Sequence, residues 1–376
     1  MELNVNDLLV LHFNIGRIVG SETTNFYYFR ENNINVKNHL NKLIERDFLI
    51  INSNPEVALP KLTIPELKEI LRTNNLKLGG KKQELVNRIL ENIDAINLES
   101  FDLPSIYEAT DKGKRTLDDT LYIKHFYNDY LVSMPRAFKI ATTDLNSKDK
   151  IEYIYMTEIK YEMSVNNDSH RLSGLFNALA TYYKTNKNNN ELARQYYNVG
   201  YYTSVKSELN SLTRYFNHTE ISENVSLYRI EPNFKMEELY EQLIYVDNTS
   251  DELLQTLFIK DVQNFYSIDE ELALNLINYI IARIKKENQE SKANDIFEYA
   301  NLTANTNESS NYSSEDNFLN ENIDIKTNTN IDTNKENPNK TKVIDDEVTN
   351  NSDALKGCGC LIFIILFISG CSMLVF

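Results

Sequence analysis

Residues Leu62–Ile93 read LTIPELKEILRTNNLKLGGKKQELVNRILENI, and this stretch decides the local fold more clearly than any other part of the chain. Thr63 and Glu66 have the spacing of a capping box, and Pro65 suits the first turn of a helix. Apolar residues recur at helical spacing on both sides of a Gly-Gly-Lys-Lys corner. They are Ile64, Leu67, Ile70 and Leu71 before the corner, and Leu85, Val86, Ile89, Leu90 and Ile93 after it. The sequence therefore predicts two short amphipathic helices whose apolar faces pack together.

The stretch around the corner is strongly basic. From 68 to 88 the chain has six cationic residues against the two carboxylates of Glu69 and Glu84, although its overall formal charge is −16. The cationic residues are Lys68, Arg72, Lys77, Lys81, Lys82 and Arg88. Unpaired N–H groups and the dipole at the start of the second helix also attract phosphate. Because runs of charge are usually solvated surfaces, an ordinary helical hairpin is the alternative.

The same stretch resembles the SAP motif, a helix-loop-helix module of chromatin and repair proteins that binds nucleic acid. The matching positions are Leu62, Glu66, Leu67, Lys68, Leu71, Leu76, Gly80, Lys82, Leu85, Val86, Arg88 and Ile89, in roughly a tenth of the chain. In that family the turn and the start of the second helix approach the phosphate backbone. The resemblance therefore implies that Gly79, Gly80, Lys81 and Lys82 contact nucleic acid. We expect residues 61–95 to bind DNA, or RNA, with the six cationic residues and the two glycines as the site.

Bulk composition indicates an acidic protein whose body we expect to lie inside the cell, although the body is also simply poor in thiols. A length of 376 residues with 41% hydrophobic composition can build two or three domains. The net negative charge argues against broad coating of nucleic acid, so any such contact must be local. The three cysteines, Cys358, Cys360 and Cys371, lie in the last nineteen residues, so the body of the chain has no disulfide. The N-terminal sequence MELNVNDLLVLHF has no basic start and no small-residue cleavage site, so we expect no signal peptide.

Residues 1–60 and 96–124, on either side of the basic hairpin, predict a small helical unit with two strands. Val5–Val19 is apolar at helical spacing, and Leu49–Ile51 predicts a short strand. Ser105–Leu117, SIYEATDKGKRTL, predicts a strand, a turn at Lys112-Gly113 and a helix start. This segment is similar to the second wing strand of winged-helix domains. We therefore expect 1–60 to be winged-helix-like, 96–124 to be a wing or connector, and the SAP-like motif to lie near or within the unit.

The recognition-helix candidate of this unit is Asn35–Phe48. It carries Lys37, His39, Lys42 and Arg46 against Glu45 and Asp47, a mixed surface that is compatible with phosphate contact. The alternative is a helix that packs on one face and is solvated on the other. We expect His39 to be a surface residue rather than a metal ligand.

Residues 125–301 predict an all-α domain of helical hairpins that is rich in tyrosine. RLSGLFNALATYYKT and ELARQYYNVGYYTSVKSEL are separated by a polar turn at 187–190, and small residues recur along both segments. This pair resembles one tetratricopeptide-type hairpin, a surface that could bind a peptide, so we expect a protein partner here. The alternative is a plain helical core in which Tyr182, Tyr183, Tyr196 and Tyr197 pack. Acidic residues outnumber basic ones in this part, which argues against nucleic acid as its ligand.

The remainder predicts a tether and an anchor. Residues 302–353 are dominated by Asn, Thr, Ser, Asp and Glu without apolar periodicity, so we expect a disordered acidic linker. Residues 357–376 read GCGCLIFIILFISGCSMLVF, and nineteen of them follow without a charged side chain. About 20 apolar residues span the hydrocarbon core as one helix. The anchor residues that we single out are Cys358, Leu361, Ile364, Ile365, Leu366, Phe367, Ile368 and Phe376. A buried core helix is the alternative.

The sequence as a whole predicts a mostly α-helical, membrane-tethered and non-enzymatic nucleic-acid-binding protein. We expect a single membrane span at 357–376 with the body facing the cytoplasm. No HExxH, paired-cysteine or phosphate-loop pattern occurs in the body, so we expect no cofactor and no metal. The competing hypothesis is a membrane-anchored protein-interaction scaffold whose lysines are merely solvated. A third is an enzyme whose site has no sequence signature.

Overall fold

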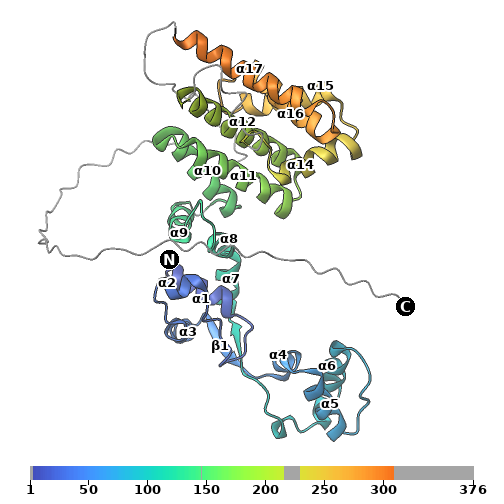
Figure 1. Ribbon diagram of the computed structural model, residues 1–376. Coiled ribbons are helices and arrows are strands. Elements are labelled where there is room, and N and C mark those ends of the chain that lie inside the picture. Colours follow the sequence, from blue (N-terminus) through green and yellow to red (C-terminus); the bar gives the residue numbers. More distant parts are fainter. Residues whose placement is uncertain (1–2, 145, 216–228, 309–376) are drawn as a thin grey trace, which may run out of the picture. The chain divides into compact units, whose positions relative to one another are not determined.

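The computed structural model describes residues 3–144, 146–215 and 229–308, and this part of the chain is mostly helical, as expected (Figure 1). The predicted anchor at 357–376 lies outside the described residues, and so does the predicted linker beyond Glu308. Among the described helices, none is long and apolar enough to cross a bilayer.

The N-terminal unit begins with three helices, α1 (Val5–Asn14), α2 (Tyr27–Glu31) and α3 (Val36–Glu45). Asn4 and Asp7 form a complete capping box at the start of α1. Asn35 caps α3 by accepting a hydrogen bond from the backbone N–H of Asn38. The predicted helix Asn35–Phe48 is therefore present but shorter, because Asp47 has a φ of 60° and turns the chain into β1.

A small sheet joins parts of the chain that lie on either side of the basic hairpin. Strand β1 (Leu49–Asn52) pairs antiparallel with β2 (Ile106–Ala109), and Asn52 lies opposite Ile106. On the other edge of β2, Ile18 forms a bridge to Ile106. Backbone hydrogen bonds from Gly16 N to Tyr107 O and from Val19 N to Ser105 O extend this pairing. Strand β2 thus lies between the 16–19 segment and β1.

The expected helix Val5–Val19 is wrong beyond Asn14. Gly16 has a φ of 73°, a left-handed conformation that ends the helical path. Residues 16–19 then pair with β2 instead of continuing α1. The apolar residues Ile18 and Val19 belong to this extended segment, which simple periodicity did not separate from the helix.

The expected turn at Lys112-Gly113 is also wrong, because both residues lie in the first turn of α7 (Asp111–Asp119). Thr110 caps this helix by accepting a hydrogen bond from Gly113 N at 3.0 Å. A Cβ atom at Gly113 would lie 2.1 Å from the carbonyl oxygen of Phe48. The glycine therefore permits the close approach of α7 to the start of β1, rather than a turn.

The segment between the two strands folds as a separate hairpin. It contains α4 (Pro55–Ala58), η1 (Leu59–Lys61), α5 (Ile64–Thr73), α6 (Lys82–Glu91), η2 (Ile93–Ala95) and η3 (Leu98–Ser100). Its buried residues form a cluster distinct from that of the remaining described chain. Insertion into a host sheet therefore leaves this module with its own core.

The helical region follows α7. Its helices are α8 (Tyr122–Phe126), α9 (Met134–Thr143), α10 (Lys150–Tyr161), α11 (Ser169–Asn186), α12 (Asn190–Tyr215), α14 (Phe234–Glu241), α15 (Asp251–Gln263), α16 (Glu270–Lys285) and α17 (Gln289–Glu308). Short π-helical segments, η4 (Glu162–Asn166) and η6 (Gln242–Val246), follow α10 and α14. Helix α8 crosses the expected boundary at 125, and α17 continues past the expected end at 301.

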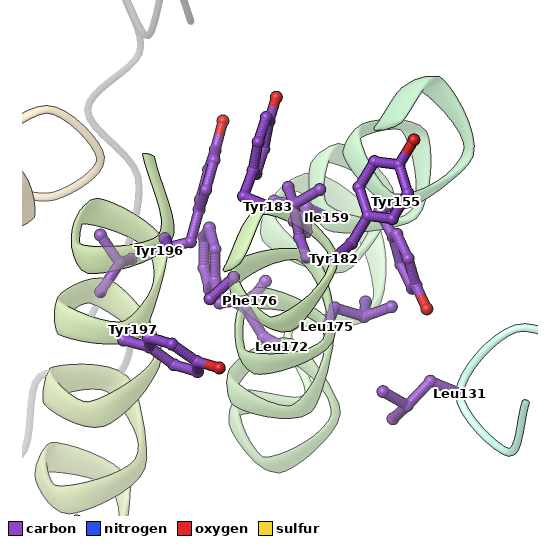
Figure 2. Packing of buried hydrophobic residues seen from close by; sticks show 14 of the residues in the cluster. Leu131, Tyr155, Ile159, Leu172, Leu175, Phe176, Tyr182, Tyr183, Tyr196 and Tyr197 are labelled. Carbon is purple, nitrogen blue, oxygen red and sulfur yellow. The ribbon is translucent and has the colours of Figure 1, made fainter. Parts of the chain in front are cut away.

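The predicted hairpin of α11 and α12 is confirmed, and the four tyrosines expected in its core are buried. The rings of Tyr183 and Tyr196 stack with centroids 5.5 Å apart and an interplanar angle of 9° (Figure 2). Tyr182 and Tyr197 are buried as well. Helices α1, α8, α10 and α12 contribute to one continuous cluster of buried residues. The N-terminal unit and the helical region therefore share a core.

Candidate nucleic-acid interface

The two helices of the basic hairpin are held by the predicted apolar faces. Thr63 and Glu66 form the capping box, and the backbone N–H of Thr63 donates to Glu66 Oε2 at 2.6 Å. The buried cluster between the helices contains Leu59, Leu62, Leu67, Ile70, Leu71, Leu85, Val86, Ile89 and Ile96. The capping box is confirmed, and so are the two apolar stripes except at two positions: Ile64 is 42% exposed, and Ile93 lies beyond α6 and outside this cluster. The corner is thus presented by a packed scaffold rather than by a loose loop.

The loop between α5 and α6 is fixed by backbone geometry. Asn75 has a φ of 53°, and the N–H of Leu76 donates to the carbonyl of Leu71 at 2.8 Å. Gly80 has a φ of 131°, a conformation that L-residues with a side chain rarely adopt. The Glu84 carboxylate lies beside it, 2.5 Å from the position that a Cβ atom would take. Gly79 has no comparable restriction.

Arg88 holds the loop in place. Its guanidinium donates to the carbonyl oxygen of Lys77 at 2.7 Å and to that of Gly79 at 3.1 Å. The sequence placed Arg88 among the phosphate-contacting residues. The structure gives it a positioning contact, because at least part of its hydrogen-bonding capacity is used within the hairpin.

The corner itself is open to solvent and rich in donors. Lys81 is the N-cap residue of α6, and no side chain caps this helix within the described residues. The first N–H groups of a helix have no intrahelical partner, so they are available to an anion. Gly79, Gly80, Lys81 and Lys82 are all exposed. The structure thus brings the four residues singled out at the corner to one solvent-facing helix start.

The other predicted cations differ in their surroundings. Lys77 is exposed in the loop, and Lys68 is half-buried on α5. Arg72 pairs with Glu69 one turn earlier on the same helix. Both partners are largely exposed, so this pair contributes little to stability and can exchange its partner. Lys77 therefore adds to the charge of the corner most directly.

The carboxyl group of Glu66 shows the electrostatic character of the hairpin. The hydrogen bond from the backbone N–H of Thr63 lowers the pKa of Glu66, and the Thr63 hydroxyl and the charge of Lys82 lower it further. Lys82, at the start of α6, is therefore close enough to the start of α5 to act on it. The ionised carboxylate of Glu66 caps the start of α5 by accepting the hydrogen bond from the backbone N–H of Thr63.

Helix α3, the second candidate surface, is organised differently from the prediction. His39 is not a free surface residue, because its Nδ1 lies 2.7 Å from Oδ1 of the fully buried Asp7. Lys42 Nζ lies 2.9 Å from Asp7 Oδ2. Burial opposes ionisation of Asp7, but the hydrogen bonds from His39 and Lys42 outweigh it and lower the pKa of this carboxyl. Among the basic residues predicted on α3, His39 and Lys42 thus hold the helix against α1 through Asp7, whereas Lys37 is exposed.

The sequence did not reveal that Asp7 is the buried partner of His39 and Lys42. Asp7 lies on an apolar helix, and its capping-box spacing with Asn4 was the available signal. Its second role depends on residues more than thirty positions away, which no local pattern reveals.

Comparison with known proteins identifies one part of the chain. Residues 58–94 are a SAP domain, which includes α5, the corner and α6. The resemblance of the basic hairpin to the SAP motif is thereby confirmed. No curated protein and no solved structure matches the chain.

Proposed function

We propose that this chain is a membrane-tethered, non-enzymatic protein that binds nucleic acid, DNA in the first place, through its SAP domain. The observation that carries the proposal is the exposed and uncapped start of α6, with Lys81 and Lys82 on it, inside a recognised SAP domain. Backbone N–H groups and lysines at a helix start fit phosphate oxygens without reading bases. We therefore expect affinity with little sequence preference.

The direct test removes the two corner lysines. Lys81→Ala with Lys82→Ala should weaken binding to duplex DNA about equally for unrelated sequences. It should also reduce the slope of log affinity against log salt by roughly 2, because two phosphate contacts are lost. Fluorescence anisotropy over a salt series measures both quantities.

The matched control is Lys139→Ala with Lys160→Ala, which removes the same charge from exposed positions on α9 and α10. It should leave the slope unchanged. Equal affinity and slope in the corner variant and the parent chain would contradict the proposal and favour the scaffold hypothesis.

We propose in addition that the N-terminal unit is winged-helix-like and that the SAP domain is inserted between its two wing strands. The support is the order α1, the bridged segment at 16–19, α2, α3, β1 and β2, with β2 paired on both edges. The SAP domain connects β1 to β2, where a wing loop would lie. Residues 1–60 and 96–124 then form the unit that carries the SAP domain.

The membrane anchor at 357–376 is proposed from sequence, since it lies outside the described residues. Nineteen residues without a charged side chain favour transfer into lipid over exposure to water. Residues 354–376 fused to a soluble reporter should carry it into membranes and resist carbonate extraction.

In the same fusion, Ile364→Asp with Ile365→Asp should return the reporter to the soluble fraction, because each carboxylate in mid-span costs about 3 kcal/mol on insertion scales. Ser369→Ala in the same segment is the control, and it should leave the fusion in membranes. A soluble, monomeric parent fusion would rule out the anchor.

A further inference from the structure

Two adjoining hollows lie on the helical region, away from the SAP domain in sequence. One has a volume of about 650 Å³ and the other about 450 Å³, and both are lined by Tyr130 and Leu131. The larger is bounded by His125 and Tyr155 on one side and by α11 on the other. The smaller contains Arg136 and the carboxylates of η4 and α10. The two hollows share Tyr130 and Leu131, and we refer to them together as the α11 groove.

One face of α11 forms the floor of this groove. The residues that line it are Arg171, Gly174, Asn177, Ala178, Thr181 and Thr185. Their spacing of three and four residues puts them on one side of the helix. From 171 to 185 the face is about 21 Å long at 1.5 Å per residue. An extended peptide of about six residues has the same length.

Small residues shape the floor of the groove. Gly174 and Ala178 add almost no side-chain bulk, and the Leu131 side chain packs over Gly174, where a Cβ atom would lie 2.9 Å from it. Asn177 and Asn233 line the same hollow, and Asn233 Nδ2 donates to Asn177 Oδ1 at 3.0 Å. Asn233 Oδ1 also accepts from the backbone N–H of Met236, so the Nδ2 group of Asn177 is the donor that this pair leaves for a peptide carbonyl.

Asp129 supplies a charge that the groove does not neutralise. Its Oδ1 accepts hydrogen bonds from the backbone N–H groups of Leu131 and Val132, and its Oδ2 accepts one from the Tyr155 hydroxyl at 2.8 Å. Among the described residues, no lysine or arginine pairs with this carboxylate. By contrast, Glu158 in the neighbouring hollow is paired with both Arg136 and Arg171.

The groups around Asp129 do not change this balance. His125 Nε2 lies 2.9 Å from the Tyr155 hydroxyl, and burial lowers the pKa of His125, so the imidazole is neutral at neutral pH. Tyr130, next to Asp129, is 89% exposed, and its ring is available to a cation. A carboxylate held by fixed donors beside an exposed aromatic ring suits a cationic side chain.

We propose that the α11 groove binds an extended peptide segment of another protein and that a lysine or arginine of this segment pairs with Asp129. The match in length, the amide N–H groups of Asn177 and the unneutralised charge of Asp129 define this partner. The proposal goes beyond nucleic-acid binding, because the groove lies outside the SAP domain and its free charge has the opposite sign.

The test uses the full chain in detergent micelles and fluorescein-labelled hexapeptide pools with one fixed central residue. Pools with fixed lysine or arginine should bind at least ten-fold more tightly than pools with fixed norleucine or glutamate. Asp129→Asn should reduce binding of the lysine pool to the norleucine level. Asp118→Asn, the same charge change at an exposed position on α7, should not.

A second variant guards against local distortion at Asp129. Ala178→Leu adds bulk to the floor and should weaken all pools by a similar factor while the melting temperature stays within a few degrees of the parent. Equal binding of all pools, or unchanged binding in both groove variants, would overturn the proposal. Competition by free lysine amide as strong as that by the hexapeptide would show a small-cation site and would overturn it as well. DNA affinity serves as the independent readout, and Asp129→Asn should leave it unchanged.

Discussion

At the scale of single residues, several polar side chains are buried and have structural roles that the sequence alone does not reveal. His12 is an example: it lies on α1, is only 4% exposed, and its Nε2 lies 2.9 Å from the hydroxyl of Thr120. That hydroxyl donates to the carbonyl of Thr116, so it accepts from His12, which must carry its proton on Nε2. A charged imidazole would also carry a proton on Nε2, so it is the burial of the ring that favours its neutral form in the folded protein.

The neutral His12 predicts a pH-dependent stability. Burial, aided by the charge of Lys124, lowers the pKa of His12 from 6.5 to about 4. Between these values the unfolded chain binds more protons than the folded chain, so the free energy of unfolding rises with pH and is lost as the pH falls. From pH 7 to pH 5 the loss from this residue is about 2 kcal/mol.

Urea denaturation at the two pH values measures this loss. His12→Gln should show a smaller difference between pH 7 and pH 5 than the parent, because the amide does not titrate. His170→Gln, at an exposed position, should behave like the parent. The assignment fails if His12→Gln keeps the full pH dependence of the parent.

At the scale of elements, the hairpin of α5 and α6 shows how a loop conformation sets a binding surface. Gly80 has a φ of 131° and faces the Glu84 side chain, whereas a Cβ atom at Gly79 would meet nothing closer than 3.9 Å. Gly80→Ala should therefore destabilise the hairpin by about 1–3 kcal/mol through backbone strain. Gly79→Ala should be nearly neutral for the hairpin.

Hydrogen exchange of the α5 and α6 amides in the full chain distinguishes the two variants. Gly80→Ala should speed exchange in both helices and weaken DNA binding, because the corner loses its fixed geometry. Similar protection in both variants would show that the loop can relax without cost.

Elements stabilised by nearby residues were predictable from sequence, and those stabilised by distant contacts were not. The capping box of Thr63 and Glu66 and the α11–α12 hairpin follow from local spacing. Gly113 was misread because the reason for it is the carbonyl of Phe48, sixty-five positions earlier. In the same way, local spacing was enough to place the four corner residues at the start of a helix, whereas the loop-holding role of Arg88 and the buried partner of His39 depend on distant contacts.

At the scale of the molecule, the two strands that flank the SAP domain predict that it can be removed. Asn52 and Ile106 lie opposite each other, and the buried clusters of host and insert are distinct. Replacing residues 53–105 by Asn-Gly should leave a β-hairpin of a favoured type. The shortened chain should stay helical and unfold cooperatively, as circular dichroism during urea denaturation would show, and it should lose DNA binding.

A loss of helical signal in the shortened chain would show that the host needs its insert. Replacement of 53–105 by a Gly-Ser loop of the original length is the control, since it keeps the spacing without the turn. Retained DNA affinity in either variant would place the nucleic-acid site outside the SAP domain.

The double attachment of the SAP domain also affects how it can turn. A module on one flexible linker swivels freely, whereas this one leaves the sheet at two paired residues and is connected again by the hydroxyls of Ser53 and Ser105, 2.9 Å apart. Two neighbouring strands leave the module free to tilt, but a full rotation would wind them around each other. A nucleic acid bound at the start of α6 would therefore transmit torque, as well as tension, to the β1–β2 pair.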